Sequence, residues 1–256
     1  LFQNADVVGG NFEGAVGPAN RCIPGRIPCF ATQEDQIALL RDAGFRVMTI
    51  ENNHSGDLGR PGREQTLKAM EQAGILAVAF SDSPQFLQVG KVTLAWVAIT
   101  AIPAADGEVQ QPRSPQVLEK LREARRHANI VVVSIHWGNE LIEWPSDSQR
   151  KEAAWLIRQG ADLILGHHPH VVQPPECIAG RPVFFSLGNH VFDQVNPKTR
   201  EGLIADCEVS GRKLQCRGLQ THTGPGSSMP VPAGPDRATN LELARCAHQI
   251  RSIPAR

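Results

Sequence analysis

The feature that most constrains the fold is a regular alternation of helix and strand patterns through the middle of the chain. Helical periodicity bounded by capping residues and glycines predicts helices over residues 32–43, 62–73, 114–128 and 146–159. Short apolar runs between them predict strands over residues 46–50, 75–80, 91–100, 130–135, 161–165 and 183–187. Thr32 is expected to cap the first helix. Such alternation predicts an α/β fold with a largely parallel or mixed sheet system covered by helices.

The last part of the chain follows a different pattern. Residues 203–208 and 213–219 predict a β-hairpin that turns at Gly211-Arg212. Residues 221–236 are rich in Gly, Pro and Ser and predict a loop, and a short helix is expected over residues 238–250. The 256 residues suffice for one large domain or two small ones with a sizeable core.

Charge and hydropathy exclude two classes of protein. The chain has 26 basic and 26 acidic side chains, which argues against a nucleic-acid binder that relies on a basic surface. No apolar run approaches the roughly 18 residues that span a bilayer, so we expect no membrane span in this chain.

The six cysteines bear on the compartment. None forms a Cys-x-x-Cys pair, which argues against a thiolate zinc site. Cys207 and Cys216 would face each other across the predicted hairpin, and Cys22 and Cys29 bracket a short loop with proline and glycine. If both pairs are disulfides, the protein is extracytoplasmic, either periplasmic or secreted. The alternative is free buried thiols in a cytoplasmic protein.

Six of the nine histidines each follow a predicted strand, where ligands of α/β proteins gather: His54, His136, His167, His168, His170 and His190. The strongest local signal is the stretch from Gly166 to His170. Neutral imidazole is the commonest biological metal ligand. In an extended backbone, residues two apart point to the same face, so we expect His168 and His170 to converge on one ion or on two neighbouring ions.

Three other segments offer ligands or catalytic groups. Glu13 could bind a metal, although such a residue is commonly a surface carboxylate. Asn53 offers an amide oxygen, and His54 could act as a general acid or base with Asp57 orienting its ring; a plain turn is the alternative. His136 ends the most apolar strand and could reach a cleft or be a hydrogen-bonded structural residue. Together they predict a mixed oxygen and nitrogen site for one or two divalent ions, Mn, Fe or Zn rather than Ca or Mg.

Five ordered motifs over residues 1–194 resemble the CapA-like family, which is named for a poly-γ-glutamate capsule protein. The family is a branch of the calcineurin-like metallophosphatase superfamily. The motifs are Asn11-Phe12-Glu13-Gly14; Asn52-Asn53-His54 with Asp57 and Gly59; His136-Trp137-Gly138 with Glu140; Gly166 to Val171 with Gln173 and Glu176; and Ser186-Leu187-Gly188-Asn189 with Phe192-Asp193-Gln194.

The resemblance implies a four-layer α/β/β/α sandwich of two mixed sheets, with a dinuclear site at one end. Residues 1–220 would form this domain, and residues 221–256 a C-terminal loop and short helix packed on it. The motifs place the metal ligands at Glu13, Asn53, His136, His168 and His170. They make His54 the catalytic histidine, with Asp57 and Glu140 as the other catalytic candidates, and rank His167 lower.

The chain departs from the family pattern in two respects. The superfamily begins with a strand carrying an Asp ligand, and this sequence starts after that point. Either that segment is missing from the sequence, or the site is incomplete and holds one ion. The family usually has Phe where this chain has His190, which is either an extra polar group in the cleft or a histidine packed on its edge.

The resemblance does not fix the reaction. The leading hypothesis is hydrolysis or transfer at an amide, peptide or γ-glutamyl bond of an anionic polymer or peptide, in polyglutamate or cell-surface polymer metabolism. Phosphoester hydrolysis is a second hypothesis, against which no Arg or Lys stands inside the motifs. A metal-dependent peptide epimerase is a third, and a non-catalytic module for polymer binding or assembly is a fourth.

Overall fold

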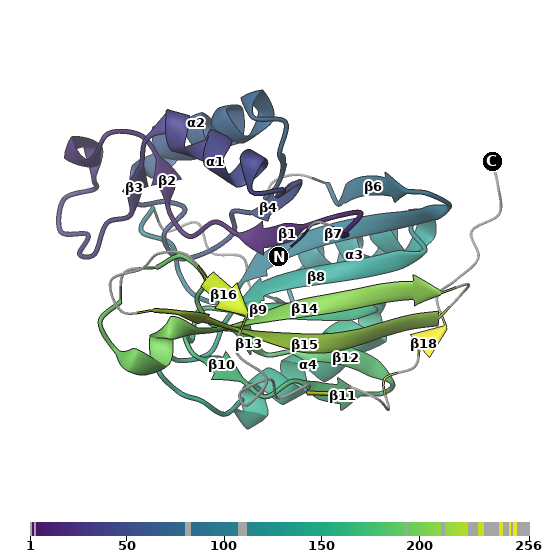
Figure 1. Ribbon diagram of the computed structural model, residues 1–256. Coiled ribbons are helices and arrows are strands. Elements are labelled where there is room, and N and C mark those ends of the chain that lie inside the picture. Colours follow the sequence, from purple (N-terminus) through teal and green to yellow (C-terminus); the bar gives the residue numbers. More distant parts are fainter. Residues whose placement is uncertain are drawn as a thin grey trace.

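A six-stranded mixed sheet forms the centre of the molecule in the computed structural model (Figure 1). The structure describes residues 2, 4–79, 83–106, 112–192, 194–210, 213–224, 230–232, 241–242, 246 and 248–249. The strands lie in the order β11 (Glu176–Ile178), β12 (Arg181–Phe184), β9 (Leu163–His167), β8 (Ile130–His136), β7 (Val92–Thr100) and β6 (Gln85–Val89). The inner four are parallel and the two edge strands antiparallel. Every residue of β8 is buried, which explains its continuous β-branched sequence.

Two helices, α3 (Pro115–His127) and α4 (Asp147–Gln159), cover one face of this sheet (Figure 1). Ser114 begins α3 by accepting a hydrogen bond from the N–H of Val117, and Ser146 begins α4 in a capping box with Gln149. The apolar stripe of each helix packs on alternate residues of β7 and β8, such as Val133. This cluster is the first half of the core.

The opposite face packs against a second layer of strands. Three parallel strands make one part of it: β1 (Gly9–Asn11), β4 (Val47–Thr49) and β5 (Leu76–Val78). The hairpin of β14 (Glu201–Ser210) and β15 (Lys213–Thr223) makes the other, and β16 (Pro230–Pro232), β17 (Leu241–Glu242) and β18 (His248–Gln249) pair with β15. Trp96, Val132 and Phe184 of the central sheet pack between Val47 and Leu203 of this layer.

The outermost layer contains α1 (Ile37–Asp42) and α2 (Gly59–Gln72), which pack on the far side of β4 through Ile37, Met48 and Met70. The order helices, sheet, sheet, helices confirms the four-layer sandwich. The remaining short elements are η1 (Ala19–Arg21), β2 (Ala15–Val16), β3 (Ala31–Thr32), η2 (Glu34–Gln36), β10 (Val172–Gln173), β13 (Ser186–Leu187) and η3 (Pro197–Arg200).

Two local predictions were wrong. Thr32 does not cap a helix, because it lies in β3 and pairs with Val16; Gln33 forms the capping box instead. The short helix expected over residues 238–250 is replaced, in the part that the structure describes, by β17 and β18 on the edge of β15. The free edge of β15 offers hydrogen bonds that local helix propensity does not anticipate. The expected division at residue 220 falls within β15 and stays a prediction.

Three disulfides join all six cysteines. The expected pairs Cys22–Cys29 and Cys207–Cys216 are confirmed, and the second lies directly across the hairpin in register. Cys177–Cys246 was not predicted, since its partners are 69 residues apart. Among the described residues, no helix is both long and apolar enough to cross a membrane.

Candidate metal centre

The carboxyl ends of parallel strands bring the candidate residues together. Glu13 follows β1, Asn53 and His54 follow β4, and His136 ends β8 next to His167 of β9. The loops after β1 and β4 belong to one sheet and those after β8 and β9 to the other. The site therefore lies at one end of the sandwich, where both sheets contribute loops.

Glu13 is the common neighbour of three imidazoles. Its Oε1 atom lies 3.9 Å from Nε2 of His54, 3.7 Å from Nε2 of His136 and 3.6 Å from Nε2 of His170. One ligand atom each from Glu13, His168 and His170 fall within 4.8 Å of one another. This is the spacing of groups that share an ion rather than a direct hydrogen bond.

The polar atoms at this point lack protein partners. Oε1 of Glu13, Oδ1 of Asn53, both ring nitrogens of His136 and Nδ1 of His168 are buried without a hydrogen bond. A buried polar atom left unpaired costs about 1–3 kcal/mol, so several at one point need an explanation. One carboxylate, one amide oxygen and several imidazole nitrogens suit Mn, Fe or Zn. The residues therefore fit a divalent ion, and their individual roles as ligands stay predictions.

The backbone after β9 differs from the expectation. His168 and His170 have φ of 101° and 58°, so the segment is not extended as predicted. Non-glycine residues in the left-handed region are strained and occur often at functional sites. The two rings still converge, with centroids 6.1 Å apart. Nδ1 of His170 donates a hydrogen bond to Oδ1 of Asn189 at 2.9 Å. The free lone pair of the ring is therefore on Nε2, which faces Glu13.

Burial dominates the electrostatics of the site. It raises the pKa of Glu13 to about 8, with the charges of Glu140 and Asp57 adding to the effect and Arg26 opposing it. Burial lowers the pKa of His136 well below its usual value, and burial together with His170 lowers that of His168 to about 4. Burial also lowers the pKa of His170, so His136, His168 and His170 are neutral near pH 7, the form in which imidazoles bind metals.

His54 and Asp57 form a hydrogen-bonded pair beside the centre. Nδ1 of His54 donates to Oδ2 of Asp57 at 2.8 Å, while its Nε2 faces Glu13. Burial alone would raise the pKa of Asp57, but hydrogen bonds from His54, the Phe30 N–H and Arg26 outweigh it, and the pKa is lowered. Asp57 is thus an ionised carboxylate that orients the ring, as expected from the sequence.

The remaining candidates lie further out. Glu140 is exposed in the loop after β8 and affects the centre through its charge. Nε2 of His167 forms a hydrogen bond with Oγ of Ser134 at 3.0 Å. Nδ1 of His190 lies 3.3 Å from Oγ1 of Thr221. Trp137 belongs to the core. Asp193 of the last motif lies outside the described residues.

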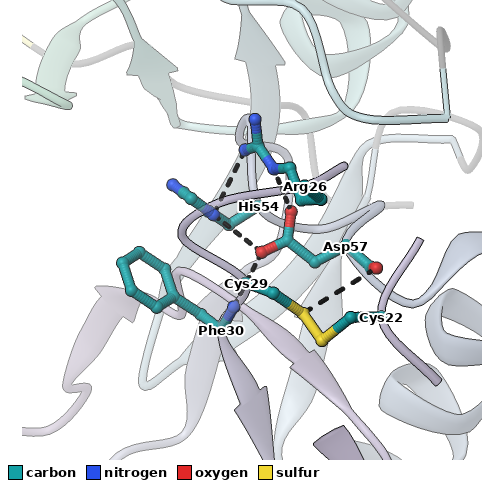
Figure 2. The surroundings of a disulfide bond; sticks show 6 residues. All are labelled: Cys22, Arg26, Cys29, Phe30, His54 and Asp57. Carbon is teal, nitrogen blue, oxygen red and sulfur yellow. Dashed lines mark hydrogen bonds and ion pairs between the residues drawn. A yellow bond between two sulfur atoms is a disulfide. The ribbon is translucent and has the colours of Figure 1, made fainter. Parts of the chain in front are cut away.

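Four residues of the site were not singled out as site residues from the sequence: Arg26, Phe30, Asn189 and Phe192. Arg26 and Phe30 contact Asp57 and His54 (Figure 2). Phe192 links Phe30 to His170, with ring centroids 5.2 and 4.8 Å away. Only the flanking pair Cys22 and Cys29 could have directed attention to Arg26.

Comparison with known proteins agrees with this arrangement. The chain is 34% identical over 220 residues to the PGA biosynthesis protein CapA of Bacillus subtilis, covering 80% of this chain and 58% of that protein. It is 32% identical over 223 residues to the capsule biosynthesis protein CapA of Bacillus anthracis, covering 79% and 54%. A probable polyglutamine synthesis accessory protein of Mycobacterium tuberculosis is 25% identical over 192 residues, covering 64% and 50%. The chain thus spans about half the length of these relatives.

A crystal structure described as a novel phosphatase from Mycoplasma pneumoniae shares the fold. Its TM-score is 0.52 at 13% identity, over 89% of this chain and 80% of that one. The model of the bacterial capsule synthesis protein PGA_cap family matches residues 1–194, which contain every candidate ligand. With this match, the chain belongs to the bacterial capsule synthesis protein PGA_cap family.

Proposed function

We propose that this chain is a metal-dependent hydrolase or transferase acting on an amide, peptide or γ-glutamyl bond. The observation that carries the proposal is the cluster of unpaired buried atoms around Oε1 of Glu13, because a bound cation would satisfy a carboxylate oxygen and neutral imidazole nitrogens together. Glu13, Asn53, His136, His168 and His170 would hold one or two ions of Mn, Fe or Zn. Such ions lower the pKa of water and polarise carbonyl oxygens.

His54 supplies proton transfer in this proposal. Its Nδ1–H is held by Asp57, so the Nε2 atom that faces the centre can accept or return a proton. The same atom could receive the proton of an attacking hydroxyl and deliver it to a departing amine. Glu140, at the exposed side, contributes through its charge, which raises the pKa of Glu13.

The substrate class and the location follow from the relatives and the disulfides. The named relatives act in PGA or capsule biosynthesis, which favours an anionic polymer or peptide as the substrate. Three disulfides favour an oxidising compartment, so we place the protein outside the cytoplasm.

The test combines metal analysis with turnover. Protein purified without chelator is expected to hold one or two ions, and His168→Ala or His170→Ala to lose most of them. Metal-loaded protein incubated with poly-γ-glutamate is expected to release new amine ends. His222→Ala, which changes a histidine outside the site on β15, serves as the control. Bound metal with no new amine ends, but with solvent deuterium incorporated into a peptide, would assign epimerisation instead. Weak metal retention and no turnover would assign a binding module.

Phosphoester hydrolysis is the second candidate, because Arg26 brings to the site a cation that the motifs lack. Guanidinium groups bind phosphate oxygens well. Its Nε and Nη2 atoms are already engaged by Asp57 and Asn53, which is why we rank this candidate second. Turnover of phosphomonoesters or diesters by the metal-loaded protein, without release of amine from polyglutamate, would reverse the ranking.

A further inference from the structure

The segment between Cys22 and Cys29 reaches the catalytic pair from outside the five sequence motifs. Residues 22–30 lie between η1 and β3 and contain no helix or strand. The Cys22–Cys29 disulfide closes residues 22–29 into a ring, called here the disulfide loop. Figure 2 shows this loop beside Asp57, with Arg26 and Phe30 directed at the carboxylate and at His54.

The disulfide loop and the residue after it hold Asp57 at three points. The N–H of Ile23 donates to the Asp57 carbonyl oxygen at 2.9 Å. Nε of Arg26 donates to Oδ1 at 2.7 Å, and the N–H of Phe30 donates to Oδ2 at 2.8 Å. The third donor to the carboxylate is Nδ1 of His54, also on Oδ2. Two of the three donors that orient the Asp57 carboxylate therefore come from this segment.

The same segment also fixes the neighbours of Asp57. Nη2 of Arg26 donates to the backbone oxygen of Asn53 at 2.8 Å and lies 3.2 Å from Nδ1 of His54. The Phe30 ring lies on the imidazole, with centroids 4.1 Å apart. One guanidinium thus donates to the carboxylate of Asp57 and to the backbone of a predicted ligand, and it lies against the imidazole that the same carboxylate holds. The Asp57 side chain is fully buried and that of Arg26 is 23% exposed, so water competes weakly for these bonds.

We propose that Arg26 is a positioning residue for the His54–Asp57 pair, and that the Cys22–Cys29 disulfide is what keeps Arg26 in place. The physical reason is entropic, because a loop that contains no helix or strand explores many conformations unless its ends are joined. The Arg26 guanidinium directs one donor to the Asp57 carboxylate and another to the Asn53 backbone oxygen, and a flexible side chain on an open loop would keep both in place only part of the time. This proposal deepens the proposed function by naming what completes its proton-transfer pair.

The contacts of Arg26 with the His54–Asp57 pair are called here the clamp. The experiment disrupts the clamp in two ways and compares each with a matched control. Arg26→Gln and Cys22→Ser/Cys29→Ser remove the guanidinium or open the loop. Arg217→Gln removes an exposed guanidinium paired with Asp206, and Cys207→Ser/Cys216→Ser opens the other short disulfide. For each zinc-loaded protein, bound metal, kcat, KM and the NMR resonance of the His54 Nδ1–H are measured. His54→Asn identifies that resonance.

Both clamp variants are expected to lose the Nδ1–H resonance to exchange with water. Their kcat should fall about 10- to 100-fold, the range seen when a partner behind a catalytic or ligand group is removed. KM and bound zinc should stay within about twofold, and both controls should match wild type. Arg26→Lys should recover part of kcat, because an ammonium restores the charge and a donor to Asp57 but not the second directed donor that reaches the Asn53 backbone.

Three outcomes would overturn the proposal. The first is an unchanged resonance and kcat in both clamp variants. The second is loss of zinc together with kcat in Arg26→Gln, which would mean that Arg26 supports Asn53 rather than the His54–Asp57 pair. The third is an equal loss in the controls. If Cys22→Ser/Cys29→Ser does not fold, the two Arg26 variants decide. If wild type turns over no substrate, the proposed function fails, whereas the resonance still tests the clamp.

Discussion

Replacing Glu13 by glutamine should stabilise the metal-free protein at alkaline pH while removing metal binding. The carboxylate is 9% exposed, and burial raises its pKa from 4.5 to about 8. Because the folded-state pKa is the higher one, folding favours the protonated form. Below pH 4.5 the carboxyl group is neutral in the folded and the unfolded protein, so its ionisation does not lower the stability. As the pH rises from 4.5 to about 8, the loss of folding free energy that comes from this group grows. Above that pH, the ionised form costs about 5 kcal/mol in the metal-free protein.

Glutamine has nearly the same shape and no charge to desolvate, so Glu13→Gln should lack this penalty. The assay is urea unfolding of chelator-treated wild type and Glu13→Gln at pH 5 and pH 8.5. The variant should gain several kcal/mol relative to wild type between the two pH values, and added metal should stabilise only wild type. Titrations of groups remote from residue 13 are common to both proteins and cancel in the difference. Parallel pH profiles for the two proteins would refute the assignment of Glu13 as a buried carboxylate that needs a cation.

Three more predictions test other parts of the structure. Asp57→Asn should retain bound metal but lose at least about 100-fold in kcat, because an amide does not stabilise a protonated His54. Steady-state kinetics together with metal analysis check this prediction, and loss of metal would contradict it. Gly166→Ala should lower the free energy of unfolding by about 3 kcal/mol or more in urea, since a Cβ there would overlap the backbone carbonyl of Phe185. A change under about 1 kcal/mol would contradict this close packing of Gly166 on Phe185. Burial and the nearby His190 charge lower the pKa of His167 to about 3, so the folded state resists a proton that the unfolded chain accepts below pH 6.5. Stability is therefore lost as the pH falls, and His167→Gln should recover about 3 kcal/mol at pH 4.5 in unfolding experiments; an equal acid sensitivity of both proteins would argue against this burial.

Local patterns in the sequence were sufficient for most of the architecture. The buried strand β8 and the helices α3 and α4 were predicted within a few residues, because burial on both faces and side-chain capping leave signals that are contiguous in the chain. The failures occurred where a distant partner decided the structure. β17 and β18 follow the edge of β15, and Thr32 follows the edge of β2. A free strand edge can override a weak local preference.

In the candidate site too, some features could be predicted from the sequence and others depended on distant partners. The sequence by itself proposed His168 and His170 as metal ligands from local chemistry, because imidazoles clustered after a strand carry a signal that needs no coordinates. It proposed Glu13, Asn53, His54 and His136 through their match to the motifs of the family. Only the tertiary structure decided that Oε1 of Glu13 faces three imidazoles, that left-handed backbone aims the last two histidines, and that Asn189 orients one of them. It alone also placed Arg26 on Asp57, across 31 residues. The physical reason is that the chemistry of a side chain is a property of one residue, whereas its partner and direction depend on how two sheets and a cross-linked loop pack together.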